Sequence, residues 1–83
     1  MNKIIYQPKA LKQLRKIPTA KAILAQIENE LVAMPNCLNV TKLHNHQYDY
    51  RFRVGNYRVL FNYEKIISIV SIEEVKKRDE RTY

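Results

Sequence analysis

The segment around the only glycine of the chain places the strongest constraint on its fold. On both sides of Gly55-Asn56, apolar or aromatic residues alternate with polar ones, which is the period-two pattern of a strand with one buried face. A two-residue connection with glycine first is typical of a type II′ hairpin turn. The sequence therefore predicts an antiparallel hairpin with an aromatic face packed on the core. The residues of that face are Tyr48, Tyr50, Phe52, Val54, Tyr57, Val59, Phe61 and Tyr63.

The same hairpin is expected to gather arginines on its other face. Arg53 would lie opposite Arg58, and Arg51 would share their side because alternate residues of a strand point the same way. Like charges that face each other across two strands are destabilising by up to about 1 kcal/mol. Three arginines without obvious acidic neighbours therefore suggest a face that receives an anion, and a solvated sheet face is the alternative. Guanidinium groups grip phosphate and stay charged, so they are clamps rather than bases.

The N-terminal half predicts one strand and two helices. Residues 2–6 are typical of a short strand, and Pro8 suits the first turn of a helix, where its missing N–H has no cost. Apolar residues then recur at helical spacing until Pro18 ends the pattern. Thr19 is the expected N-cap of a second helix, which stops before Pro35.

The remainder of the chain completes an α+β layout. A short strand over residues 40–43 is compatible with the sequence, and Glu64-Lys65 predicts a second reversal into a strand over residues 66–72. Residues 73–83 then form a charged tail. We expect one domain over residues 1–83, with a short N-terminal strand and two helices packed on one face of a twisted antiparallel sheet.

Composition limits the class of protein. Fifteen Lys and Arg against eight Asp and Glu give a net charge of +7, which favours a polyanionic partner, either nucleic acid or an acidic protein. The 46% hydrophobic content excludes wholesale disorder, and no apolar run is long enough to cross a membrane. No apolar stretch follows Met1, and a lone Cys37 provides neither an internal disulfide nor a zinc site. We expect a cytoplasmic protein without a metal or cofactor.

Groups for acid–base chemistry are few. His44 and His46 lie in a polar connection with no partner at a readable spacing, and we interpret them as surface residues. The tail ends on Tyr83, which suits stacking on a base or proton transfer, although a solvated, helical or frayed terminus is the alternative. The basic residues of the tail are Lys76, Lys77, Arg78 and Arg81. The sequence contains no phosphate-binding glycine loop and no recognisable Ser/His/Asp or paired-carboxylate arrangement.

Taken in order, these motifs resemble the RelE/ParE toxin superfamily of bacterial type II toxin–antitoxin systems. The similarity covers essentially the whole chain, through residues 8–14, Lys42-Leu43 and the terminal Lys77-Arg78…Tyr83, and its most specific part is Tyr-Arg-x-Arg-Val-Gly-x-Tyr-Arg at residues 50–58. The resemblance implies a small microbial-ribonuclease-like fold, in agreement with the layout from periodicity. In this superfamily, RelE-like members cleave mRNA in the ribosomal A site, whereas ParE-like members poison DNA gyrase and lack the RNase residues.

The resemblance to the RelE branch also implies a set of catalytic residues. The basic positions on the middle strands of the family fall on Arg51, Arg53 and Arg58. The terminal tyrosine of the family matches Tyr83, and the basic residue before it matches Arg78 or, in a second register, Arg81, with Arg78 in the better fit. The family often has lysine at the first two of these positions, so a lysine general base is missing here.

From this resemblance we expect a metal-independent endoribonuclease that inhibits translation and depends on the ribosome. The 2′-hydroxyl of the RNA would attack the adjacent phosphate, with Arg51, Arg53 and Arg58 stabilising the phosphate charge. Arg78 would stabilise or protonate the leaving group, and Tyr83 would orient the substrate or act as the base.

The expected partners are mRNA, the ribosome and an antitoxin that silences the toxin in a hetero-oligomer. The basic residues expected to contact RNA or the ribosome are Lys9, Lys12, Arg15, Lys16, Lys76, Lys77 and Arg81. Two other classes remain open. A ParE-like gyrase inhibitor would have no hydrolytic site, and a basic RNA-binding module would bind RNA with strong salt dependence and leave it intact.

Overall fold

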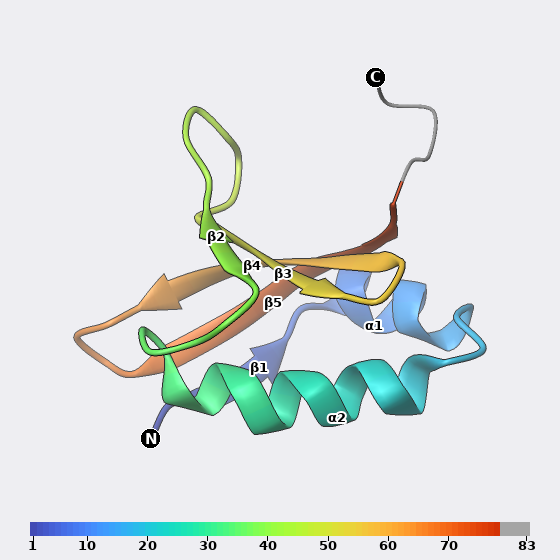
Figure 1. The fold of residues 1–83 in the computed structure, drawn as a ribbon, viewed down its shortest axis with the longest axis horizontal. Coiled ribbons are helices and arrows are strands. Elements are labelled where there is room, and N and C mark those ends of the chain that lie inside the picture. The colour runs from blue at the N-terminus through green and yellow to red at the C-terminus, as the bar shows by residue number, and fades with distance from the viewer. Residues whose placement is uncertain (79–83) are drawn as a thin grey trace.

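Five strands form one sheet in the order β1-β5-β4-β3-β2 in the computed structural model, which describes residues 1–78 (Figure 1). Their bounds are β1 (Lys3–Tyr6), β2 (Val40–Lys42), β3 (Tyr50–Val54), β4 (Tyr57–Glu64) and β5 (Ile69–Lys77). Strands β2 to β5 pair antiparallel with their neighbours, whereas β1 pairs in parallel with β5. The predicted α+β fold is confirmed, but the sheet is mixed, because a strand's residue pattern does not indicate the direction of its neighbour.

The helices α1 (Pro8–Arg15) and α2 (Ala20–Glu30) cover one face of this sheet, and a 3-10 turn follows over Leu31–Ala33 (Figure 1). Pro8 occupies the first turn of α1, as predicted. Thr19 stands at the N-cap position of α2, but its hydroxyl makes no capping hydrogen bond. Its ψ of 25° departs from the extended backbone that a capping side chain needs, so the prediction of a Thr19 side-chain cap is wrong. None of the described helices is long and apolar enough to cross a membrane.

The hydrophobic core lies between the helices and the sheet. Its buried residues from the helical layer are Ala10, Leu14, Ile23, Ile27, Leu31 and Met34, and those from the sheet are Phe52, Val59, Phe61, Val70, Ile72 and Val75. The predicted aromatic face packs here, with the rings of Tyr50 and Phe61 stacked at a centroid distance of 5.4 Å. Tyr48 is the exception, because β3 begins only at Tyr50 and the alternation does not extend back to it.

The hairpin between β3 and β4 has the predicted turn and register. Val54 faces Tyr57, and Arg53 faces Arg58. Of the two turn residues, only Gly55 has a positive φ, at +55°, which is the requirement of a type II′ turn. The space where a Cβ of Gly55 would lie is open, so glycine is needed here for its backbone conformation and not for packing.

Replacing Gly55 by alanine should therefore destabilise the protein by about 1–2 kcal/mol, the cost of holding an L-residue at positive φ. Urea unfolding of Gly55→Ala against the wild type measures this difference. Asn56→Ala is the matched control at the other turn position, and it should change the free energy of unfolding by less than about 0.5 kcal/mol. Equal stabilities of the Gly55→Ala and Asn56→Ala variants would contradict the assignment.

Strand β5 differs most from the sequence prediction. Ile66 and Ile67 are 98% and 63% exposed in the turn before it, and the strand continues through residues 73–77, which were predicted as a charged tail. The register between β4 and β5 shifts at Leu60/Phe61: Phe61 pairs with Ile72 and Leu60 with Glu74, so Glu73 is an extra residue without a partner. This β-bulge lets Ile72 and Val75 both face the core. A strict period of two cannot predict it.

Candidate nucleic-acid site on the open face of the sheet

The face of the sheet opposite the core, here called the open face, presents mainly charged side chains. Alternation along β3 and β4 turns Phe52 and Val59 to the core, and hence Arg51, Arg53 and Arg58 to the open face. On β5 the register places Lys76 opposite Arg58 and Glu74 opposite Leu60. Basic residues of three adjacent strands therefore share one side of the molecule.

Four arginine side chains line a pocket of about 90 Å³ on this face, here called the arginine pocket: Arg51, Arg53, Arg58 and Arg78. Arg78 follows the end of β5, and its backbone N–H donates to the carbonyl oxygen of Asn56 at 2.6 Å, which holds it beside the hairpin. The volume is several times the ~10–15 Å³ that one water molecule needs, so a phosphate-sized group can enter. The structure thus brings together four of the five residues that the resemblance implies as catalytic.

The pocket arginines have no acidic partner among residues 1–78. The ion pairs within this part of the chain join Glu74 to Lys9 and to Lys76, and none involves an arginine. Four permanent positive charges at close range repel one another, and an anion that enters the pocket relieves that repulsion. Guanidinium groups present paired N–H donors, which match the oxygens of a phosphate.

An acidic residue that the sequence pattern missed lies on the open face. Glu74 is only 6% exposed, and its Oε1 lies 3.3 Å from the Lys76 Nζ and 3.5 Å from the Lys9 Nζ. The arginine face therefore has an acidic neighbour that the sequence did not make evident, and Glu74 belongs to β5 and not to the predicted charged tail. The bulge in β5 turns Glu74 away from the core.

The surroundings of Glu74 keep it ionised. Burial by itself would raise the pKa of the carboxyl, but hydrogen bonding and charge from Lys76, then the charge of Lys9 and a hydrogen bond from Tyr48, lower the pKa below its ordinary value of 4.5. A carboxylate with a lowered pKa that is engaged by two lysines is a poor general base. Its contribution is electrostatic and structural.

This lowered pKa predicts a pH-dependent contribution to stability. A carboxyl whose pKa is lower in the folded state stabilises the fold above its unfolded pKa, and the effect disappears as the pH falls through the folded pKa. The free energy of unfolding of the wild type should therefore exceed that of Glu74→Gln by about 1 kcal/mol near neutral pH. This difference in stability should shrink below pH 4.5. Urea unfolding across this pH range measures the effect. A difference that stays constant with pH would show that the charge of Glu74 is not its source.

Tyr48 covers this cluster from residues 43–49, the loop between β2 and β3. It is buried, and its hydroxyl lies close enough to the Glu74 carboxylate to help lower the pKa of Glu74. Burial first, and then the charge of Glu74, raise the pKa of the phenol. The backbone N–H of Tyr48 donates to Nδ1 of His46 at 3.1 Å. The prediction that Tyr48 packs on the aromatic core face is wrong. Strand β3 begins only at Tyr50, so its alternation does not apply to Tyr48, which lies near Glu74 on the open face.

The other predicted site residues are distributed over the surface. His44 and His46 are exposed in the 43–49 loop, and neither lines the arginine pocket. Lys12, Arg15 and Lys16 are exposed on or just after α1, with Lys9 at its start and Lys76 and Lys77 at the end of β5. Arg81 and Tyr83, which were predicted as RNA-binding and catalytic respectively, lie outside the described residues.

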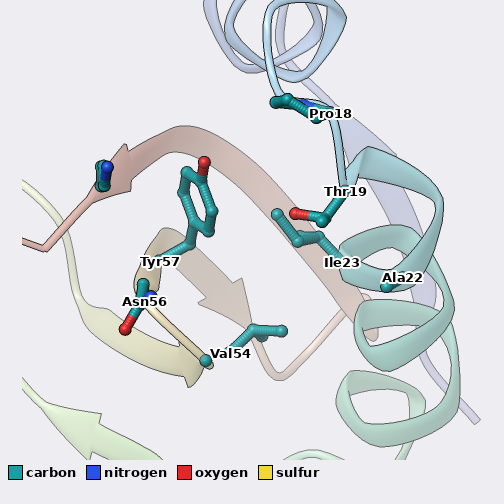
Figure 2. A pocket seen from close by; sticks show the side chains of 9 residues that line it. Pro18, Thr19, Ala22, Ile23, Val54, Asn56 and Tyr57 are labelled. Carbon is teal, nitrogen blue, oxygen red and sulfur yellow. The ribbon is translucent and has the colours of Figure 1, made fainter.

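A second hollow of about 420 Å³ lies on the other side of the hairpin (Figure 2). Pro18, Thr19, Ala22 and Ile23 of the helical layer line one side of it, and Val54, Asn56 and Tyr57 of the hairpin line the other (Figure 2). Lys77 is the one charged side chain that lines it among residues 1–78, so this part of the chain provides no acid–base pair there. Within residues 1–78, no group of three or more His, Cys, Asp or Glu side chains is arranged to hold a metal ion.

Comparisons with known proteins agree on one group of relatives. A family model described as the ParE toxin of type II toxin–antitoxin systems (parDE) matches residues 4–80. No curated protein shows significant sequence similarity to the chain.

Among solved structures, the isolated E. coli RelE toxin matches with a TM-score of 0.76 at 20% identity, over 96% of this chain and 87% of that one. The intact E. coli RelBE toxin–antitoxin complex gives a TM-score of 0.74 at 21% identity, covering 96% and 100% of the two chains. The archaeal RelE–RelB complex from Pyrococcus horikoshii gives 0.68 at 25% identity, over 98% of both chains. The likeness to the two E. coli structures is one of fold.

Proposed function

Because this chain belongs to the RelE/ParE superfamily of toxins from type II toxin–antitoxin systems, we propose that it is an endoribonuclease that cleaves mRNA in the ribosomal A site. The observation that supports this activity is the arginine pocket, which gathers four cations that have no acidic partner among residues 1–78. A toxin that acts only by binding another protein has no need for such a phosphate-sized pocket.

The proposed reaction uses the RNA's own 2′-hydroxyl as nucleophile. A bond forms between the 2′-oxygen and the adjacent phosphorus, the bond from phosphorus to the 5′-oxygen breaks, and the products are a 2′,3′-cyclic phosphate and a 5′-hydroxyl. Arg51, Arg53 and Arg58 stabilise the negative charge that develops on the phosphate oxygens, with Arg58 nearest the scissile group. Charge stabilisation by preorganised donors is the largest contribution that such a pocket can make.

The two proton transfers need other groups. Arg78 donates hydrogen bonds that stabilise the charge on the leaving 5′-oxygen. Because a guanidinium does not give up its proton, the 5′-oxygen takes its proton from solvent water. Tyr83 orients or deprotonates the 2′-hydroxyl, because a phenol can both donate and accept a hydrogen bond. Among residues 1–78, every residue that lines the arginine pocket is an arginine, so this part of the chain supplies charge to the pocket but no base. This imbalance favours an enzyme that relies on the ribosome to order its substrate.

The proposed partners follow from the same charges. The exposed lysines and arginines of α1 and of the end of β5 would contact the backbone of ribosomal RNA, and action on ribosomes would place the protein in the cytoplasm. The structural neighbours include two complexes of RelE with RelB. We propose that an acidic antitoxin likewise binds this toxin in a hetero-oligomer and holds it inactive.

Primer extension on an mRNA translated in a reconstituted system, with and without the protein, tests the activity. We expect new 5′ ends, each bearing a hydroxyl group, that appear only when the message occupies ribosomes. Strong, salt-dependent binding of RNA without new ends would instead assign a binding module.

A gyrase poison is the second candidate, because the matching family model is that of ParE toxins. Pulse labelling after expression without an antitoxin separates the two activities. The nuclease should stop protein synthesis first, whereas an early arrest of DNA synthesis with continued translation would assign the ParE-like activity.

A further inference from the structure

Glu74 is the one charged residue that is buried among residues 1–78. Its position is unexpected, because a carboxylate on a face that receives a polyanion repels the ligand. It also lies close to the arginine pocket: on the open face it is next to Lys76, and Lys76 pairs directly with Arg58. The proposed reaction does not use it.

Three elements of the fold converge on this one carboxylate. Lys9 reaches it from α1, Lys76 from β5, and Tyr48 from the 43–49 loop. The two lysine side chains are 61% and 56% exposed, whereas the Glu74 side chain is 8% exposed. The carboxylate therefore lies beneath the two ammonium groups, and a ligand that approaches the open face meets positive charge first.

We propose that Glu74 is a positioning residue of the RNA site, which holds the Lys76 and Lys9 ammonium groups so that phosphate binding extends from the arginine pocket across β5 to α1. This inference rests on the proposed function. An ammonium group has three N–H donors, and the bond to Glu74 leaves donors of Lys76 free for a phosphate. Without the carboxylate, Lys76 would be repelled by Arg58 directly opposite and would sample many rotamers.

Because Glu74 is negatively charged, a purely electrostatic role and a positioning role predict opposite changes in RNA affinity. If Glu74 acted only through its own field, Glu74→Gln would remove a negative charge and tighten RNA binding. If it positions Lys76, the same substitution weakens binding although the protein becomes more positive. We therefore expect Glu74→Gln to bind a single-stranded RNA several-fold more weakly, and the slope of log affinity against log salt to fall in magnitude by about one, the loss of one phosphate contact.

The binding probe is an RNA in which deoxynucleotides replace the nucleotides at the scissile positions, so that it cannot be cleaved. Fluorescence anisotropy measures its affinity for the protein at several salt concentrations. Glu73→Gln is the matched control, since the Glu73 carboxylate accepts from the Ser71 hydroxyl at 2.8 Å and pairs with no lysine. It should bind RNA at least as tightly as the wild type.

A double-substitution cycle with Lys76→Met tests whether Glu74 acts through Lys76. Lys76→Met should weaken binding more than Lys65→Met, which alters an exposed lysine in the turn after β4. In the Lys76→Met background, Glu74→Gln should weaken binding less than it does in the wild type, because only its effect through Lys9 remains. Additive effects, or Glu74→Gln binding as tightly as the wild type, would overturn the inference. The two lysine variants alter exposed side chains and decide the matter even if Glu74→Gln fails to fold, because equal affinities of Lys76→Met and Lys65→Met would also overturn it.

Failure of this inference and failure of the proposed function give different results. A wild type that cleaves mRNA while Glu74→Gln binds RNA normally refutes the positioning role alone. A wild type that neither binds nor cleaves RNA refutes the proposed function, and the positioning role with it.

Discussion

Reversing the charge of Arg58 should abolish mRNA cleavage without unfolding the protein. Arg58 lines the arginine pocket and lies directly between Arg53 on β3 and Lys76 on β5. Removing one preorganised donor from a charged transition state typically costs about 10²–10³ in rate, and Arg58→Glu also adds a charge that repels the phosphate. We expect single-turnover cleavage on programmed ribosomes to fall by at least about a thousandfold.

The stability of Arg58→Glu, in contrast to its cleavage rate, should be unchanged or increased. A glutamate at position 58 would face Arg53 and Lys76, so it would replace repulsion across both strand pairs by attraction. The melting temperature of Arg58→Glu should therefore equal or exceed that of the wild type. Lys21→Glu is the matched control, because it makes the same charge change at an exposed position of α2 and should retain full activity. A folded Arg58→Glu protein with undiminished toxicity would remove the arginine pocket from the mechanism.

Loss of a single hydroxyl group should have the next largest effect. Tyr83→Phe keeps the aromatic ring and removes the group proposed to orient or deprotonate the 2′-hydroxyl. General acid–base groups typically contribute about 10²–10⁴ in rate, and we expect cleavage by Tyr83→Phe to slow by about a hundredfold or more. Single-turnover cleavage compares this variant, the wild type and a chain that lacks residue 83.

The three rates distinguish the possible roles of Tyr83. If the ring only stacks on a base, Tyr83→Phe should be nearly silent and removal of the residue should cost about 1–3 kcal/mol. Equal rates for all three proteins would leave Tyr83 without a catalytic part. Tyr6→Phe provides the control for hydroxyl loss elsewhere, because the Tyr6 hydroxyl donates to Glu28 at 2.6 Å. That variant should lose some stability and keep its cleavage rate.

The parts of the fold that could be predicted depend on local signals. Gly55-Asn56 determines the turn by its backbone conformation, and the alternation beside it determines the register, so the pairing of Arg53 with Arg58 followed directly. Pro8 and Pro18 likewise marked the ends of α1, because proline changes the backbone wherever it stands. Three arginines on one face could thus be predicted from the residues alone.

The parts that could not be predicted depend on contacts between distant segments. The parallel pairing of β1 with β5 joins residues far apart in the sequence, and no local pattern encodes it. The run of charged residues predicts a solvated tail at Glu74, whereas its position in the fold depends on Lys9 from α1 and Tyr48 from the 43–49 loop. The position of Arg78 in the arginine pocket requires β5 to extend as far as Lys77. The charged composition of residues 73–77 predicts a tail there instead of a strand.

The extra residue in β5 decides on which side of the sheet the charged residues at the end of the strand lie. In an uninterrupted strand, every second residue after Ile72 would point to the core, and these would be Glu74, Lys76 and Arg78. One unpaired residue at position 73 reverses that parity, so all three appear on the side of Arg51, Arg53 and Arg58 instead. Assembly of the pocket therefore depends on a count of residues between Ile72 and Arg78. The chemical identity of residue 73 matters far less than the fact that a residue is there.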